Sequence, residues 1–146
     1  MAICISSRDG KVERVMSRLY STEYGNRPRL LLAYADGVYA SECGRYFRRL
    51  GWEVEMVASG AEARELAHDY RPDVVVLDAD LVDESGWLTS AKISTENSAL
   101  RIVLVSDDPC EHRLEMVGAS QSVSRKNGAE ALAMAILGKA SLSEAV

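Results

Sequence analysis

From residue 29 onward, short runs of apolar residues alternate with longer segments in which apolar residues recur every three or four positions. Unbroken or alternating apolar runs are typical of strands, whereas the longer spacing is typical of amphipathic helices. The pattern predicts strands at residues 30–34, 52–57, 74–78, 101–106 and, more weakly, 121–124, and helices at 38–50, 59–70, 87–95, 111–117 and 129–137. Strands that alternate with helices in this way favour a parallel sheet covered by helices on both faces.

The clearest of these strands is the one that ends at Asp78. Its residues 74–77 are three valines and a leucine, as expected for a strand buried on both faces. Residues 52–57 alternate apolar and polar side chains and are expected at an edge of the sheet. We therefore predict an α/β, flavodoxin-like (βα)5 doubly wound three-layer sandwich with parallel strand order 2-1-3-4-5.

Polar residues follow four of the five predicted strands. In the order 2-1-3-4-5, strands one, three, four and five end near one another at the carboxyl edge of the sheet, where open α/β folds place their sites. The residues that this topology is expected to bring into one pocket are Tyr34 to Asp36, Asp78, Ser106 and Arg125 or Lys126.

Three segments are expected along the chain. Residues 1–27 hold a short helical pattern in which Val12, Val15, Met16 and Leu19 share a face among basic residues. A Gly-Asn-Arg-Pro break follows, so residues 28–139 are expected to form the domain and 140–146 a flexible tail.

Composition narrows the classes of function. The 146 residues, 47% of them hydrophobic, suit one globular domain, and the formal net charge of -5 argues against a nucleic-acid partner. No apolar run approaches the roughly 18 residues of a membrane span. The N-terminus has no secretory signal pattern, so a cytoplasmic protein is expected. Cys4, Cys43 and Cys110 are scattered and suit reduced thiols rather than disulfides.

Several motifs resemble the receiver domain of two-component response regulators, over about residues 29–137. They are Leu50-Gly51-Trp52-Glu53-Val54, Ala58-Ser59-Gly60-Ala61-Glu62-Ala63, Arg71 to Asp78, Gly86 eight residues after Asp78, Ser106 and Gly118-Ala119. The resemblance implies that Asp78 is the phosphoacceptor and that Ser106 is the hydroxyl that contacts the phosphoryl group. The lysine of the family falls on Arg125, with Lys126 next to it.

The chain departs from the family pattern at the metal site and at the switch. The acidic pair that holds magnesium in the family falls on Tyr34 and Ala35, so magnesium binding is expected to be weak or absent, with Asp36, Asp78 and Asp80 as the candidate ligands. Val82 replaces the usual proline after the acceptor, and Ser122 stands at the aromatic switch position. The resemblance therefore implies an atypical receiver.

Three functions compete at this point. The first is a stand-alone, non-enzymatic receiver of a two-component phosphorelay, phosphorylated on Asp78 with a weakened switch. Its implied partners are a histidine kinase or phosphotransfer protein, a downstream protein, and a second copy through the face between the fourth and fifth helices of the domain. The second is a receiver-like interaction module that works without phosphorylation. The third follows from a resemblance to haloacid-dehalogenase-type phosphatases, with Asp78 as nucleophile, Asp80 as acid–base and Ser106 as a hydroxyl.

Overall fold

A computed structural model describes residues 27–107 and 111–137. The predicted N-terminal helix, the tail 140–146, Cys4 and Cys110 lie outside the described residues. Cys43 is buried with a free thiol.

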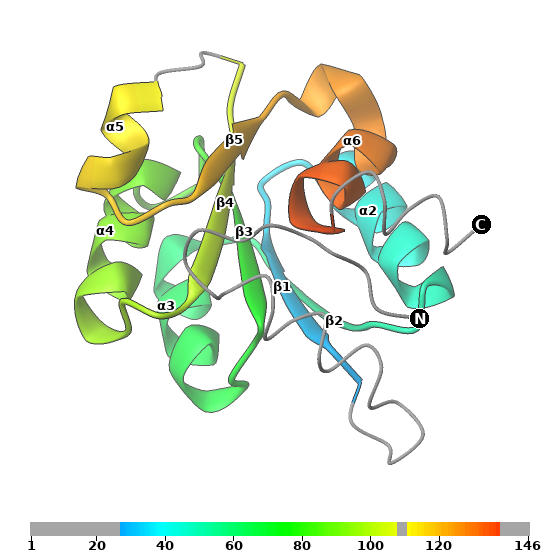
Figure 1. The fold of residues 1–146 in the computed structure, drawn as a ribbon, viewed down its shortest axis with the longest axis horizontal. Coiled ribbons are helices and arrows are strands. Elements are labelled where there is room, and N and C mark those ends of the chain that lie inside the picture. The colour runs from blue at the N-terminus through cyan, green and yellow to red at the C-terminus, as the bar shows by residue number, and fades with distance from the viewer. Residues whose placement is uncertain (1–26, 108–110, 138–146) are drawn as a thin grey trace.

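The described strands form a single parallel sheet (Figure 1). Its strands are β1 (Arg29–Ala33), β2 (Glu53–Val57), β3 (Val74–Asp78), β4 (Arg101–Val105) and β5 (Gln121–Val123). They lie in the order β2-β1-β3-β4-β5, which confirms the predicted flavodoxin-like topology. The alternating strand β2 is at an edge, as its sequence indicated, and every residue of β3 is buried.

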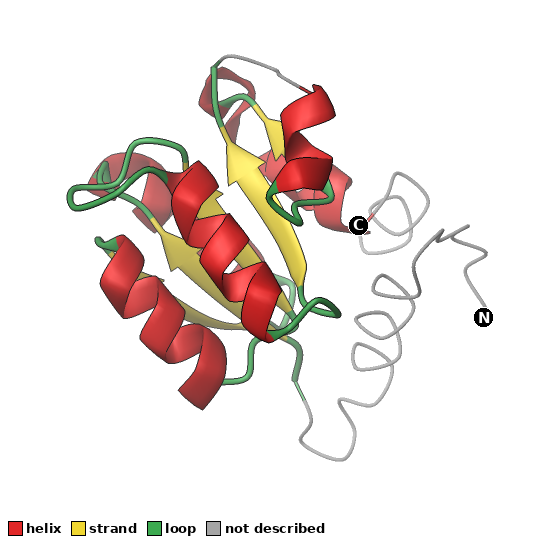
Figure 2. Ribbon diagram, turned by 90° about the vertical axis from the view of Figure 1, so that its left-hand side faces the viewer, coloured by secondary structure: helices red, strands yellow, loops and turns green. Residues whose placement is uncertain are grey.

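Helices cover both faces of the sheet (Figures 1 and 2). One face carries α2 (Gly37–Arg49) and α6 (Gly128–Leu137), and the other carries α3 (Gly60–Asp69), α4 (Gly86–Glu96) and α5 (Glu111–Met116). Because successive side chains of a strand point to opposite faces, the strands contribute side chains to two separate cores, one on each face of the sheet. Leu32 and Val76 pack with Phe47 of α2, whereas Leu31 and Val75 pack with Ile93 of α4.

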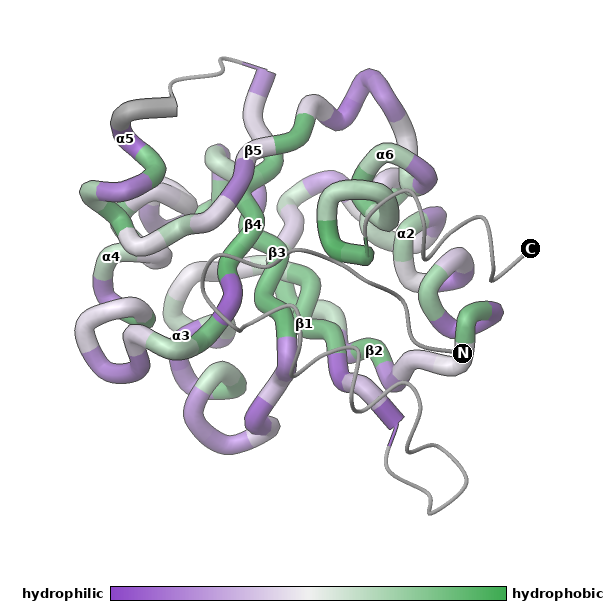
Figure 3. The backbone as a smooth tube through the Cα atoms, in the orientation of Figure 1, coloured by the Kyte–Doolittle hydropathy of each residue, from purple (hydrophilic) through white to green (hydrophobic). Residues whose placement is uncertain are grey.

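Hydropathy follows this layering (Figure 3). The apolar residues concentrate in the central strands β1, β3 and β4, while the helices carry a mixture of apolar and polar residues. Burial of all five residues of β3 and of β4 is the main reason that these strands lie in the middle of the sheet.

One element was absent from the sequence prediction. A single 3-10 turn, η2 (Arg125–Asn127), follows β5 directly. The side chain of Ser124 accepts a hydrogen bond from the backbone N–H of Lys126 and so caps this turn. The strand therefore ends at Val123 rather than at Ser124, and Arg125 begins the turn.

Candidate functional site at the carboxyl edge of the sheet

Asp78 is the last residue of the central strand β3, and its side chain is 1% exposed. Its Oδ1 accepts a hydrogen bond from the backbone N–H of Asp80 at 3.0 Å. The same oxygen accepts one from Nη2 of Arg125 at 3.3 Å. A buried carboxylate is thus held by a donor from its own loop and by a cation from the turn that follows β5.

The electrostatic environment of Asp78 contains opposing effects. Burial raises the pKa of its carboxyl group, because loss of water disfavours the charged form. The Asp80 N–H, the charge of Arg125 and the backbone N–H of Ala35 act in the other direction, while the charge of Asp80 adds to the rise. The net pKa shift is upward.

Arg125 lies where the loops after β3, β4 and β5 meet. Besides Asp78, its guanidinium is 4.0 Å from Oδ2 of Asp80 and 3.9 Å from Oδ2 of Asp107. The hydroxyl of Ser124 donates to Oδ1 of Asp107 at 3.2 Å, which ties this loop to η2. The predicted convergence of Asp78 and Arg125 therefore exists, and it includes Asp107, which the sequence pattern had not singled out as part of the cation's surroundings.

The other predicted site residues differ in how close they come. Ser106 directly follows β4 and is buried, and its backbone N–H donates to the carbonyl of Val123 at 2.9 Å. Its place at the strand end is as expected from the sequence. Lys126 is exposed on η2, whereas the neighbouring Arg125 contacts Asp78.

Of the three predicted metal ligands, Asp78 and Asp80 lie near the same guanidinium, that of Arg125, whereas the carboxylate of Asp36 is used elsewhere. Asp36 caps α2, since its Oδ1 accepts the backbone N–H of Val38 at 3.0 Å. Tyr34 is buried against Tyr39, with 4.7 Å between ring centroids. Among the described residues, no group of three or more histidine, cysteine or acidic side chains is arranged to hold a metal ion. Magnesium prefers several oxygen ligands. Because Nη2 of Arg125 donates to the Asp78 carboxylate, these aspartates as arranged do not fit a magnesium ion.

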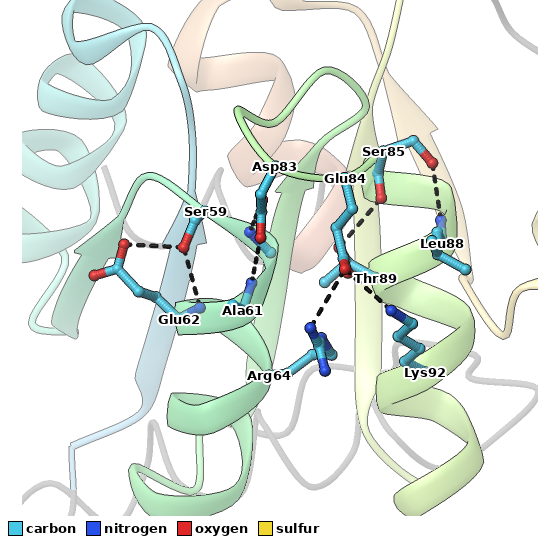
Figure 4. A network of polar contacts seen from close by, with 11 residues as sticks. Ser59, Ala61, Glu62, Arg64, Asp83, Glu84, Ser85, Leu88, Thr89 and Lys92 are labelled. Carbon is cyan, nitrogen blue, oxygen red and sulfur yellow. Dashed lines mark hydrogen bonds and ion pairs between the residues drawn. The ribbon is translucent and has the colours of Figure 1, made fainter.

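The loop between β3 and α4 is anchored by a polar network that sequence reasoning missed (Figure 4). The Asp83 carboxylate accepts the backbone N–H groups of Gly60 at 2.7 Å and Ala61 at 3.0 Å, at the start of α3. These bonds lower the pKa of Asp83, with the Gly60 bond the larger cause. Asp83 lies more than twenty residues after the start of α3, so no pattern in the neighbouring sequence indicated this contact.

Glu84 is the centre of the second half of this network. Its carboxylate accepts the Thr89 hydroxyl at 2.6 Å and pairs with Lys92 at 3.1 Å and Arg64 at 3.3 Å (Figure 4). The Thr89 hydrogen bond is the main reason that the pKa of Glu84 is lowered. The loop that carries Asp80 is therefore bound to both α3 and α4.

The family of this chain follows from its similarity to known proteins. A sequence model of the response regulator receiver domain matches residues 35–137. The chain belongs to this family. Receiver domains are signalling modules of two-component systems, and they interact with histidine kinases or phosphotransfer proteins. The family match places the chain among receivers rather than among haloacid-dehalogenase-type phosphatases.

Two relatives are bacterial regulators. The receiver domain is 33% identical over 91 residues to the probable transcriptional regulatory protein TcrX of Mycobacterium tuberculosis. It is 36% identical over 61 residues to the TorCAD operon transcriptional regulatory protein TorR of Escherichia coli. The matches cover 62% and 42% of this chain but only 39% and 26% of those proteins, respectively.

Solved structures agree on the fold. A CheY-like receiver domain protein from Methanospirillum hungatei superimposes with a TM-score of 0.71 at 18% identity, covering 82% of this chain and 96% of the other. A Burkholderia pseudomallei response regulator with a phosphorylated aspartic acid and a calcium ion has a TM-score of 0.68 at 21% identity, covering 81% and 71%. In the described part of this chain, no helix is both long and apolar enough to span a membrane.

Proposed function

We propose that this receiver domain takes a phosphoryl group on Asp78 and signals through protein contacts, with slow transfer and a weakened switch. The observation that carries the proposal is the direct contact of Arg125 with the buried Asp78 carboxylate at the carboxyl end of β3. Transfer from an acyl phosphate or a phosphohistidine needs a carboxylate nucleophile and a nearby positive charge, and both are present.

The rate is expected to be low because of the charges around the acceptor. Asp80 and Asp107 both lie within 4.0 Å of the Arg125 guanidinium, so their negative charge competes with an incoming phosphoryl group for the same cation. Raising the pKa of Asp78 also makes its carboxylate harder to keep ionised. Both effects support slow transfer.

β5 and the helices beside it are the expected route from Asp78 to a partner protein. Ser122, at the position where the family has an aromatic switch residue, is half-buried and small, so we expect weak coupling between phosphorylation and the surface. The candidate partner surface includes a cavity lined by residues of α5, β5 and α6, among them Leu114, Ser122 and Ala135. Met116, at the end of α5, is 81% exposed. A downstream protein or a second copy would bind there.

A second candidate is a receiver-like module that acts without phosphorylation. The specific observation in its favour is that the guanidinium of Arg125 already faces three carboxylates. In that case the Asp78–Arg125 pair is a structural link between β3 and η2. A cytoplasmic location remains an expectation for either function.

The experiment that separates the two candidates is incubation of the protein with acetyl phosphate and magnesium, followed by mass spectrometry. A phosphoryl mass shift that disappears in Asp78→Ala is the expected result. Asp69→Ala, a change at an exposed aspartate at the end of α3, is the matched control and should keep the shift. If the wild-type protein shows no shift after prolonged incubation, phosphorylation is rejected and the interaction module remains.

A further inference from the structure

The carboxylates near Asp78 are arranged around a guanidinium rather than around a space for a metal ion. Arg125 is 3.3 Å from Asp78, 3.9 Å from Asp107 and 4.0 Å from Asp80. The acids that the family uses for magnesium are replaced by buried Tyr34 and by Ala35, and Asp36 caps α2. The described residues hold no three-ligand metal cluster.

Arginine has the properties that this position requires. Its charge is permanent, and its planar fork carries five N–H donors. Nη2 contacts Asp78 and Nε lies 3.9 Å from Asp107, while the Arg125 side chain is 30% exposed. The guanidinium can therefore be reached from solvent, and its five N–H groups can also serve an oxygen of a phosphoryl group that bonds to Asp78.

We propose that Arg125 supplies the positive charge that a divalent cation supplies elsewhere, so that Asp78 takes a phosphoryl group from an acyl phosphate without any metal ion. This inference rests on the proposed function and names Arg125 as the source of the positive charge for the transfer. The charge is fixed in the fold by η2 and its Ser124 cap, so no ion has to be bound from solution.

The step balances without a further reactant. One Oδ of the Asp78 carboxylate attacks the phosphorus of acetyl phosphate and forms the new O–P bond. The bond between phosphorus and the acetyl oxygen breaks, and its electron pair leaves with acetate. The guanidinium compensates charge on the equatorial oxygens, and no proton is transferred.

The test compares acylphosphate-dependent labelling of the full chain in EDTA and in magnesium. We expect the same rate constant in both media. Arg125→Gln should lower it by about 10²-fold, the typical loss for one charge-stabilising donor. Arg125→Lys keeps the charge and should retain more activity than Arg125→Gln. Arg49→Gln, an exposed change at the end of α2, is the control and should match wild type.

Each labelling result supports or overturns the inference. Labelling that requires magnesium would overturn the inference and leave the proposed function intact. No labelling in either medium would reject the proposed function and the inference with it. Equal losses in Arg125→Lys and Arg125→Gln would show that the charge is not what matters, and the inference would fail.

A measurement independent of labelling uses the backbone amide NMR signals of residues 35 and 78–80. We expect no saturable shift of these signals on titration of the wild-type protein with magnesium. A saturable shift would show a metal site beside Asp78 and overturn the inference. Thermal unfolding of each variant shows whether it is folded, so that a labelling loss is assigned only to a folded protein.

Discussion

At the scale of single residues, the site depends on pairs that are distant in sequence. Asp78 and Arg125 are 47 positions apart and share a hydrogen bond of 3.3 Å. Asp36 is acidic and follows β1, yet its carboxylate is used by the backbone N–H of Val38. An acidic residue near a strand end thus becomes a nucleophile candidate or a helix cap according to which donor is nearest.

Glu84 provides a test at this scale. Its side chain is 11% exposed and accepts contacts from Thr89, Lys92 and Arg64. Glu84→Ala removes the acceptor for all three donors, and we expect a loss of about 2 kcal/mol in the free energy of unfolding, as is typical when hydrogen-bonded partners of a charged group are left unpaired. Urea denaturation at neutral pH measures the change.

Glu62→Ala is the comparison for Glu84. Glu62 is exposed, and its Oε1 accepts the Ser59 hydroxyl at 3.0 Å at the start of its own helix. We expect a loss well below that of Glu84→Ala. Equal losses for the two variants would show that the loop network does not anchor α3 to α4.

At the scale of elements, the junction between β3 and α4 is the tightest part of the site. Gly86 begins α4, and its backbone N–H donates to the carbonyl of Ala79 at 2.9 Å. A Cβ at this position would overlap the backbone carbonyl of Asp78. The close approach of helix and strand therefore requires glycine here, and it holds the end of β3 against the start of α4.

Gly86→Ala is expected to destabilise the domain by about 3 kcal/mol, the upper part of the range for overpacking a close-packed position. Because the clash is with the backbone of Asp78, labelling of Asp78 should fall as well. Gly37→Ala is the matched control, since Gly37 also begins a helix and a Cβ there meets nothing within 4 Å. Thermal unfolding of both variants is the measurement, and similar melting temperatures would contradict the prediction.

At the scale of the whole molecule, acidic groups with opposite pKa shifts decide how stability depends on pH. The pKa of Glu84 is lowered, so its contribution is fully present above about pH 4.5, the ordinary pKa of a glutamate, and is lost as the pH falls through its native pKa. The pKa of Asp78 is raised, so burial of its charge opposes folding at neutral pH. That penalty disappears as the pH falls through the native pKa of Asp78.

Asp78→Asn and wild type are expected to differ in how their free energies of unfolding depend on pH. Asparagine cannot ionise, so the variant lacks the gain in stability that wild type has at low pH. The free energy of unfolding of the variant minus that of wild type is therefore largest at neutral pH and decreases toward pH 3.8, the ordinary pKa of an aspartate. Urea denaturation at both pH values measures it. A difference that is constant with pH would contradict the raised pKa of Asp78.

The order and type of the elements, and the place of Asp78 at the end of a buried strand, follow from local sequence pattern. Apolar periodicity reports which face of a strand or helix is buried, and right-handed parallel connections leave few topologies for five such units. The receiver family, the strand order and the buried end of β3 could therefore be predicted from local pattern and motif spacing.

Which charged side chains meet depends on how distant segments pack in the folded chain. Arg125 begins a 3-10 turn that local pattern did not predict, and only the folded sheet brings its guanidinium to Asp78, Asp80 and Asp107. The anchoring of the loop by Asp83 and Glu84 depends in the same way on α3 and α4 lying side by side. Side-chain pairing between distant segments follows from distances in three dimensions, and sequence periodicity carries no information about them.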